Sequence, residues 1–224
     1  MDSNKGKLIV IEGTDGSGKA TQIAILIDRL KKENKVEAFD FPQYGNWSAI
    51  FVEKYLRGEF GSSDEVSPYK ASLFFALDRY AASFKIKKLM EDGYTVIANR
   101  YTTSNMGHQA GKIKDQKERE KFLKWLDELE FTHLGLPKPD IVIFLHMPAE
   151  IGQKLVEKKG HRDYIGDKKD IHESDIYHLR DSEKAYLQVA KMFKWKTIEC
   201  VENGSLLSKE KIAERVYSLL KGIF

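Results

Sequence analysis

The feature that most constrains this chain is a glycine-rich turn between an apolar strand and a helix. Residues 13–19 read GTDGSGK, the largely apolar run 7–11 (KLIVI) precedes them, and a helical pattern follows from about Thr21. A strand that runs through such a turn into a helix points successive backbone N–H groups and the helix dipole at one anion. The turn therefore predicts a phosphate-binding loop.

The residue types in this turn suit phosphate. Its three glycines lack a Cβ, so the main chain can take positive φ and approach phosphate oxygens closely. Lys19 is placed to reach the β- and γ-phosphates of a nucleotide. The alternative is a plain turn with a solvated lysine, but so many glycines would weaken a turn that had no ligand to hold. The predicted ATP contacts are Gly13, Thr14, Asp15, Gly16, Ser17, Gly18, Lys19, Ala20 and Thr21.

Magnesium is expected to accompany the nucleotide. Ala20 stands where most such loops carry Ser or Thr, whose hydroxyl binds the ion. Thr21 is the next residue along the helix and Asp15 lies within the loop. We therefore expect the Mg2+ ion to find its oxygens in Thr21, in Asp15, in another carboxylate, or through water.

Composition narrows the remaining possibilities. The 224 residues suit one domain, 1–224, with room for a mobile insert. A net charge of only +3 with 32% charged residues indicates a solvated surface and no nucleic-acid tail. Cys200 is the single cysteine, which fits a reducing cytoplasm and a small apolar residue in a late strand. No apolar run approaches the ~20 residues of a membrane span, so neither membrane nor nucleic acid is an expected partner.

Strands and helices alternate along the chain, which predicts an α/β fold with a parallel sheet covered by helices on both faces. Residues 141–145 form an uninterrupted apolar run, as in a strand buried on both faces. The other expected strands are 7–12, 36–41, 94–99 and 197–201. The expected helices are 18–32, 47–56, 67–90, 115–129, 149–157, 173–193 and 209–220.

Ligands of such sheets bind beyond the carboxyl ends of the strands. The segments that follow those ends are 13–19, 41–44, 99–109 and the region after His146, and the first three are polar loops in this interpretation.

Six motifs in this order resemble the thymidylate kinase family over nearly the whole chain. They are IEGTDGSGKATQ, FPQYG, LFFALDR, NRYTTSNMGHQAGK, PD before an apolar strand, and DIHE after a charged loop. The resemblance implies a P-loop NTPase fold with a five-stranded parallel sheet, a homodimer packed through helices, and ATP-dependent phosphorylation of dTMP to dTDP.

The resemblance also implies how dTMP is held. Phe75 resembles the ring that stacks on thymine, and Arg79 follows one helical turn later, so both side chains share a helix face. From periodicity alone, core packing fits Phe75 equally well, and an ion pair with Asp78 or Glu91 is the alternative for Arg79. Arg100 resembles the arginine that grips the acceptor phosphate with its planar fork.

The other implied dTMP contacts match the family position by position. Asp15 resembles the carboxylate that binds the sugar 3′-hydroxyl, and Tyr44 stands where many members carry arginine. Asn99 replaces the usual aspartate before Arg-Tyr, and His108 replaces a common tyrosine, so that a plain surface histidine is the alternative there. The remaining implied contacts are Phe41, Ser104, Asn105, Gln109 and Glu173.

The transferring phosphoryl group needs positioned cations more than it needs a base. Some family members carry an arginine within the P-loop, but Gly16 occupies that position here. We therefore expect the cation to come from a mobile LID loop at about 158–170, with Arg162 as the first candidate and Lys169 as the second. A solvated charge run is the alternative. Glu173, after this loop, is expected to approach the sugar or the metal.

Three functions remain open. The first is thymidylate kinase, with catalytic Lys19, Arg100, Arg162 and Asp15. The second is a kinase for another deoxynucleotide or a deoxynucleoside. The third is a nucleotide-binding protein with impaired turnover, suggested by Ala20 and Asn99.

Overall fold

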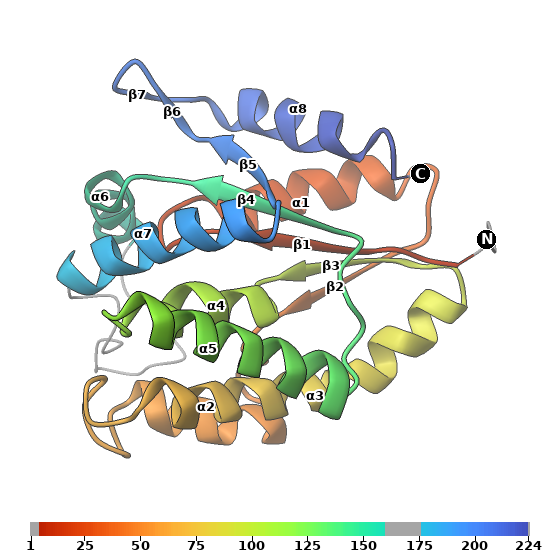
Figure 1. Cartoon of the computed structure of the whole chain (residues 1–224). Helices are drawn as coiled ribbons and strands as arrows, with labels where there is room; N and C mark the ends of the chain where they lie inside the picture. Colours follow the sequence, from red (N-terminus) through yellow and green to blue (C-terminus); the bar gives the residue numbers. More distant parts are fainter. Residues whose placement is uncertain (1–4, 160–175, 224) are drawn as a thin grey trace.

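The core of the chain is a five-stranded parallel sheet (Figure 1). The structure is a computed structural model that describes residues 5–159 and 176–223. The sheet order is β2-β3-β1-β4-β5. Its strands are β1 (Leu8–Glu12), β2 (Val36–Asp40), β3 (Thr95–Asn99), β4 (Ile141–His146) and β5 (Lys196–Glu199). The predicted α/β class and parallel sheet are confirmed.

Helices cover both faces of this sheet. In Figure 1, α1 (Lys19–Leu30) and α8 (Lys209–Leu220) lie above the sheet. Below it lie α3 (Pro68–Glu91), α4 (Thr102–Gly111) and α5 (Gln116–Asp127). Helix α7 (Ile176–Met192) packs with α4 and α5 in one apolar cluster. The remaining elements are the 3₁₀ turn η1 (Trp47–Ala49), α2 (Ile50–Leu56), the π-helical turn η2 (Glu128–His133), α6 (Ala149–Lys159), and the hairpin of β6 (Val201–Glu202) and β7 (Ser205–Leu206).

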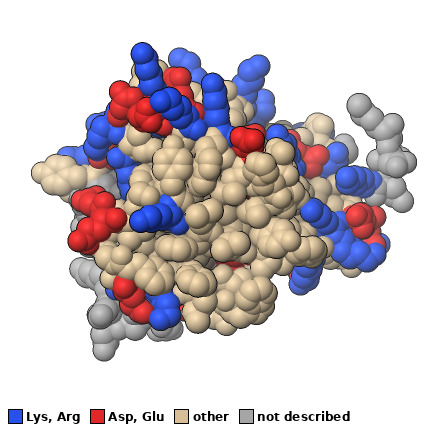
Figure 2. Space-filling view, turned by 60° about the horizontal axis from the view of Figure 1, so that its bottom comes forward, with Lys and Arg blue, Asp and Glu red and all other residues tan. Residues whose placement is uncertain are grey.

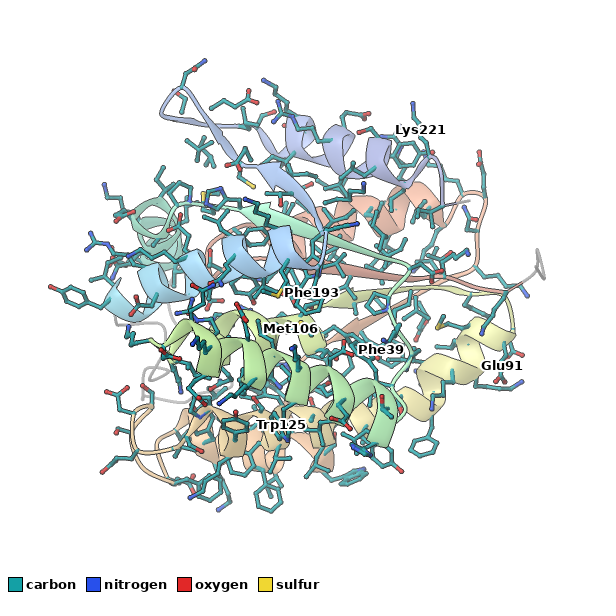
Figure 3. All side chains as sticks on the ribbon, viewed as in Figure 1. Phe39, Glu91, Met106, Trp125, Phe193 and Lys221 are labelled. Carbon is teal, nitrogen blue, oxygen red and sulfur yellow. The ribbon has the colours of Figure 1, made fainter. Side chains whose placement is uncertain are left out.

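The core forms because each central strand is apolar on both faces. Ile9 and Ile11 of β1 pack with residues of α1 and α8, whereas Leu8 and Val10 pack with residues of α3. This alternation follows the two-residue period of a strand. A further cluster on the lower face joins α4, α5 and α7 and contains Met106, which is labelled in Figure 3.

The expectation of a loop over residues 99–109 is wrong, because Thr102–Gly111 forms α4. The sequence TTSNMG contains few strong helix formers, so propensity disfavours a helix there. Tertiary contacts decide otherwise. The buried carboxylate of Glu12 accepts hydrogen bonds from Tyr101 N at 3.1 Å, Thr103 Oγ1 at 2.6 Å and Ser104 Oγ at 2.8 Å. These bonds fix the first turn of α4 against the end of β1.

The other differences between the expected and the observed elements are small. The last parallel strand ends at Glu199, and the hairpin β6–β7 was not expected. The predicted LID segment lies outside the described residues except for positions 158 and 159, which end α6. In the described part of the chain, no helix combines the length and apolar composition needed to cross a bilayer.

Candidate active site

The glycine-rich loop connects β1 to the N-terminus of α1. Gly18 precedes the helix with φ of 83°, and among the described residues no side-chain hydrogen bond caps this helix end. A Cβ at Gly18 would meet no atom of the described residues within 4 Å, so they leave the space beside it open. Uncapped N–H groups and the positive end of the helix dipole together form an anion site.

Gly16 is required for a different reason. Its φ is 78°, and a Cβ there would lie 2.2 Å from the carbonyl oxygen of Gly152 in α6. The loop therefore packs directly on the helix that leads into residues 160–175. An arginine at this position, as in some family members, would not fit the described packing.

Lys19 and Arg100 meet at one backbone atom. The carbonyl oxygen of Gly13 accepts from Lys19 Nζ at 2.8 Å and from Arg100 Nη1 at 3.4 Å. Lys19 Nζ also donates to the carbonyl oxygen of Thr14 at 3.0 Å. The two cations predicted to serve the donor and the acceptor phosphates thus lie side by side.

Arg100 occupies a constrained position at the carboxyl end of β3. Its φ of 66° lies in the left-handed region, which non-glycine residues rarely adopt, and its backbone N–H donates to Ile11 O at 3.1 Å. Nη2 donates to Asp15 Oδ1 at 2.6 Å, and Nη1 contacts His108 Nε2 at 3.0 Å. Because a guanidinium has no acceptor, His108 Nε2 accepts this bond.

Arg100 stays cationic in this setting. Burial lowers the pKa of its guanidinium, but the attraction of Asp15, Tyr186, Glu12 and Tyr44 outweighs burial and raises the pKa above its ordinary value. A permanent positive charge at this point suits a phosphate dianion.

A cavity of about 420 Å³ lies between the loop and Arg100. It brings together fifteen of the predicted site residues: Asp15, Gly16, Gly18, Lys19, Ala20, Phe41, Tyr44, Phe75, Arg79, Asn99, Arg100, Ser104, Asn105, His108 and Gln109. Pockets of this size suit a small ligand such as a nucleotide.

Four other residues predicted to contact ATP do not line this cavity. Thr21 is exposed on α1, and the Thr14 hydroxyl donates to Met147 O at 3.4 Å. Gly13 contributes its carbonyl oxygen to the two cations, and the Ser17 hydroxyl is buried without a hydrogen-bond partner in the described structure. Arg162, Lys169 and Glu173 lie outside the described residues, so their roles stay predictions.

The part of the cavity wall that contains Phe75, Phe41 and Gln109 is aromatic and polar. Phe75 meets Tyr55 edge to face, with ring centroids 6.1 Å apart, and Phe41 packs against Tyr101 at 5.9 Å. Gln109 is buried, and its Oε1 has no partner in the described structure. This acceptor is available to a ligand.

Arg79 has a partner that the sequence did not suggest. Its Nε donates to Glu130 Oε2 at 2.6 Å, and its Nη2 donates to Glu130 Oε1. The alternatives Asp78 and Glu91 are wrong as partners. Asp78 accepts from Gln43 N at 2.9 Å and from Ser48 Oγ at 2.6 Å, and Glu91 lies at the far end of α3 (Figure 3).

Sequence reasoning missed several further residues. Asp40, Pro42, Leu56, Asp78 and Val156 complete the cavity wall. A signal was available for one of the supporting residues, because Glu12 is a charged residue at the end of an otherwise apolar strand. The Glu12 carboxylate also accepts from Tyr186 Oη of α7 at 3.0 Å, and burial raises the pKa of Tyr186, which keeps that hydroxyl protonated.

The oxygen donors suit magnesium by chemical type. Asp15 and Asp40 place carboxylates in the cavity wall, and Asp40 Oδ1 accepts from Asn99 Nδ2 at 2.7 Å. Within the described residues, no group of three or more His, Cys, Asp or Glu side chains could hold a metal. Mg2+ commonly uses one or two carboxylates together with nucleotide phosphates and water, so these residues fit an ion that arrives with ATP.

The fold and this loop define a P-loop protein, and one cavity extends from the loop to Arg100. A family model described as thymidylate kinase matches residues 11–212. The chain belongs to the thymidylate kinase family.

Individual relatives agree with this assignment. Thymidylate kinase of Mycobacterium tuberculosis (strain H37Rv) is 32% identical over 82% of this chain and 85% of its own length. That of Plasmodium falciparum is 32% identical over 70% of this chain and 72% of its own length. A solved structure of thymidylate kinase from Candida albicans has the same fold, with a TM-score of 0.72 at 23% identity over 97% of this chain and 92% of that one.

Proposed function

We propose that this protein transfers the γ-phosphoryl group of ATP to dTMP and releases dTDP and ADP. The observation that carries the proposal is the contact of Lys19 and Arg100 with one carbonyl oxygen, that of Gly13. Two phosphate-binding cations so placed hold a donor and an acceptor phosphate end to end. Positioning of this kind supplies much of the catalysis in phosphoryl transfer.

Each residue has a distinct role in this reaction. The N–H groups at the start of α1 and Lys19 bind the β- and γ-phosphates of ATP. Arg100 holds the dTMP phosphate so that an oxygen of this phosphate attacks the γ-phosphorus of ATP. As that bond forms, the bond from the γ-phosphorus to the bridging oxygen breaks, and ADP leaves with the electron pair.

Asp15, the carboxylate of the phosphate loop, is assigned two ligands, the Mg2+ ion and the 3′-hydroxyl of the dTMP sugar. Asp15, with Asp40 nearby in the wall, would hold Mg2+, and the bound ion would neutralise phosphate charge. Asp15 also orients Arg100 through their 2.6 Å hydrogen bond. Phe75 and Asn105 hold the base.

A homodimer is part of the same proposal. Leu73, Leu77, Tyr80 and Phe84 are exposed at helical spacing along α3, opposite the buried Ala82 and Ile86. Figure 2 shows this side of the molecule, the bottom of Figure 1, as a broad area with few charges. Exposed apolar side chains of η1, α2, α3 and the segment after α2 include Trp47, Ile50, Phe51, Phe60, Leu73, Leu77, Tyr80 and Phe84. So large an apolar face marks an interface, and we assign it to a second copy of the chain.

A cytoplasmic location is also proposed. Cys200, the single cysteine, is a buried free thiol, as is usual for proteins of a reducing compartment.

The test is a panel of acceptors assayed with ATP and Mg2+ by coupled detection of ADP. Phosphorylation of dTMP above all other nucleotides and of no nucleoside is the expected result. Preference for an unphosphorylated nucleoside would indicate a deoxynucleoside kinase. ATP binding without transfer to any acceptor would indicate a protein that has lost turnover.

A further inference from the structure

Glu130 does not line the cavity, but it lies behind the wall and bonds to two wall residues, Arg79 and Asn105. It is completely buried in η2, the π-helical turn that follows α5, and π-helical turns are frequent at functional sites. Its carboxylate accepts from Arg79 Nε and Nη2, from Thr102 Oγ1 at 2.7 Å and from Asn105 Nδ2 at 3.3 Å. Four hydrogen bonds occupy all the lone-pair positions of a carboxylate.

This carboxylate fixes the orientation of the Asn105 amide. Asn105 Nδ2 donates to Glu130 Oε1 and, at 3.2 Å, to the carbonyl oxygen of Ser72. Both amide hydrogens are therefore used within the described structure. A flipped amide would place Oδ1 against a carboxylate and a carbonyl, which is repulsive. Asn105 therefore offers its acceptor, Oδ1, to a ligand in the cavity that it lines.

The same carboxylate fixes Arg79. The pair joins the Nε–Nη2 edge of the guanidinium to both carboxylate oxygens, and the side chains of Arg79 and Glu130 are 2% and 0% exposed. Nη1 lies at the opposite vertex of the planar group. Arg79 also lines the cavity, so a ligand bound there meets the N–H donors of its guanidinium.

From these contacts we propose that Glu130 is a positioning residue that sets base specificity. It holds Asn105 so that Oδ1 is presented as an acceptor, and it holds Arg79 so that the guanidinium is presented as a donor beside it. Thymine and uracil complement this pattern because N3–H donates and O4 accepts. Cytosine opposes it, because its N3 is an acceptor and its N4 amine is a donor. This inference rests on the proposed function and adds the determinant of base recognition.

The sharpest readout is the ratio of kcat/KM for dUMP to kcat/KM for dCMP, because both nucleotides lack the 5-methyl group and differ in hydrogen-bond pattern. The wild-type protein is expected to favour dUMP by at least ~100-fold, since a site built on buried polar groups rejects a ligand that leaves them unpaired. A ratio near one would overturn the proposal.

Glu130→Gln tests the determinant itself. The amide keeps the size of the side chain, but it no longer forces Asn105 to present Oδ1. The ratio is expected to fall at least ~10-fold, and the ratio of the two dissociation constants, measured by calorimetry without ATP, is expected to fall with it. A purely structural role would lower both rates and leave the ratio unchanged, which would refute the proposal.

Thr102→Val is the matched control. It removes one hydrogen bond from the same buried carboxylate, but it leaves the contacts of Arg79 and Asn105 in place. The ratio is expected to stay at the wild-type value. An equal fall in both variants would show that general loosening of the site, and not the orientation of Asn105, controls the choice of base.

A measurement on the wild-type protein covers the case in which Glu130→Gln does not fold. The probe is dTMP methylated at N3, which lacks the N–H donor. Binding is expected to be at least ~100-fold weaker than that of dTMP. Equal binding would contradict the orientation assigned to Asn105. If the wild-type protein phosphorylates no nucleotide at all, the proposed function itself fails, which is a separate outcome.

Discussion

Arg100 donates to the carboxylate of Asp15 at 2.6 Å, and both side chains are largely buried, at 16% and 14% exposed. The pair joins the phosphate-binding loop to the segment after β3. Asp15 therefore orients the cation that is assigned to the acceptor phosphate.

Arg100→Ala should abolish transfer to dTMP and leave ATP binding intact, because the guanidinium serves the acceptor. A loss of at least ~100-fold in kcat/KM is expected, as for other groups that stabilise charge in the transition state. Steady-state kinetics and ATP calorimetry check this. Equal losses of ATP affinity and of transfer would contradict the role given to Arg100.

Phe84→Asp should dissociate the proposed dimer. Phe84 is 60% exposed on the apolar face of α3, so a charge there would be buried against the partner. Sedimentation equilibrium should show a dissociation constant at least ~10-fold weaker. Met192→Asp, on the exposed end of α7, is the control and should not change the assembly. A monomeric wild-type protein at high concentration would exclude the interface.

Lys112 should make the free energy of unfolding depend on pH in the alkaline range. Burial lowers the pKa of Lys112 to about 8, against the attraction of Asp64, and Nζ donates to Tyr55 Oη at 2.7 Å and Ser63 O at 2.9 Å. Since the folded pKa lies below the ordinary 10.5, the stability contributed by Lys112 is complete above pH 10.5 and is lost as pH falls to about 8. Relative to Lys112→Met, the free energy of unfolding of the wild-type protein should therefore increase as pH rises from about 8 to 10.5.

Urea denaturation of both proteins at the two ends of this range measures the difference. Lys117→Met, at an exposed position of α5, is the control. A difference between wild type and Lys112→Met that does not change with pH would show that the buried amine does not titrate as assigned.

His146 should have the opposite pH dependence. It lies between Glu183, at 2.9 Å, and Glu199, at 2.6 Å, and these hydrogen bonds raise its pKa. The stability it contributes is therefore complete below pH 6.5 and is lost as pH rises through the higher folded pKa. Thermal melting of the wild-type protein and His146→Gln should differ more at about pH 6 than at about pH 8.5. His133→Gln, on an exposed histidine, is the control, and the same pH dependence in both variants would reject this assignment.

The sequence predicted the fold well, because the phosphate loop and the alternation of strands and helices depend on neighbours in the chain. It failed at α4, where Thr102 to Gly107 disfavour a helix locally. There the contacts of Glu12, and a glycine at position 107 that leaves space for the ring of Tyr186, override propensity. The roles of the site residues stay predictions, although fifteen of them line one cavity.

What the sequence alone determined is the loop itself, because its glycines, its lysine and the start of its helix are consecutive residues and their geometry is local. What only the tertiary structure decided is which charges meet. Arg79 and Glu130 are 51 residues apart, and Arg100 and Asp15 are 85 residues apart. Such pairs form only where folding removes the side chains from water and brings them together, and no local pattern specifies that partner.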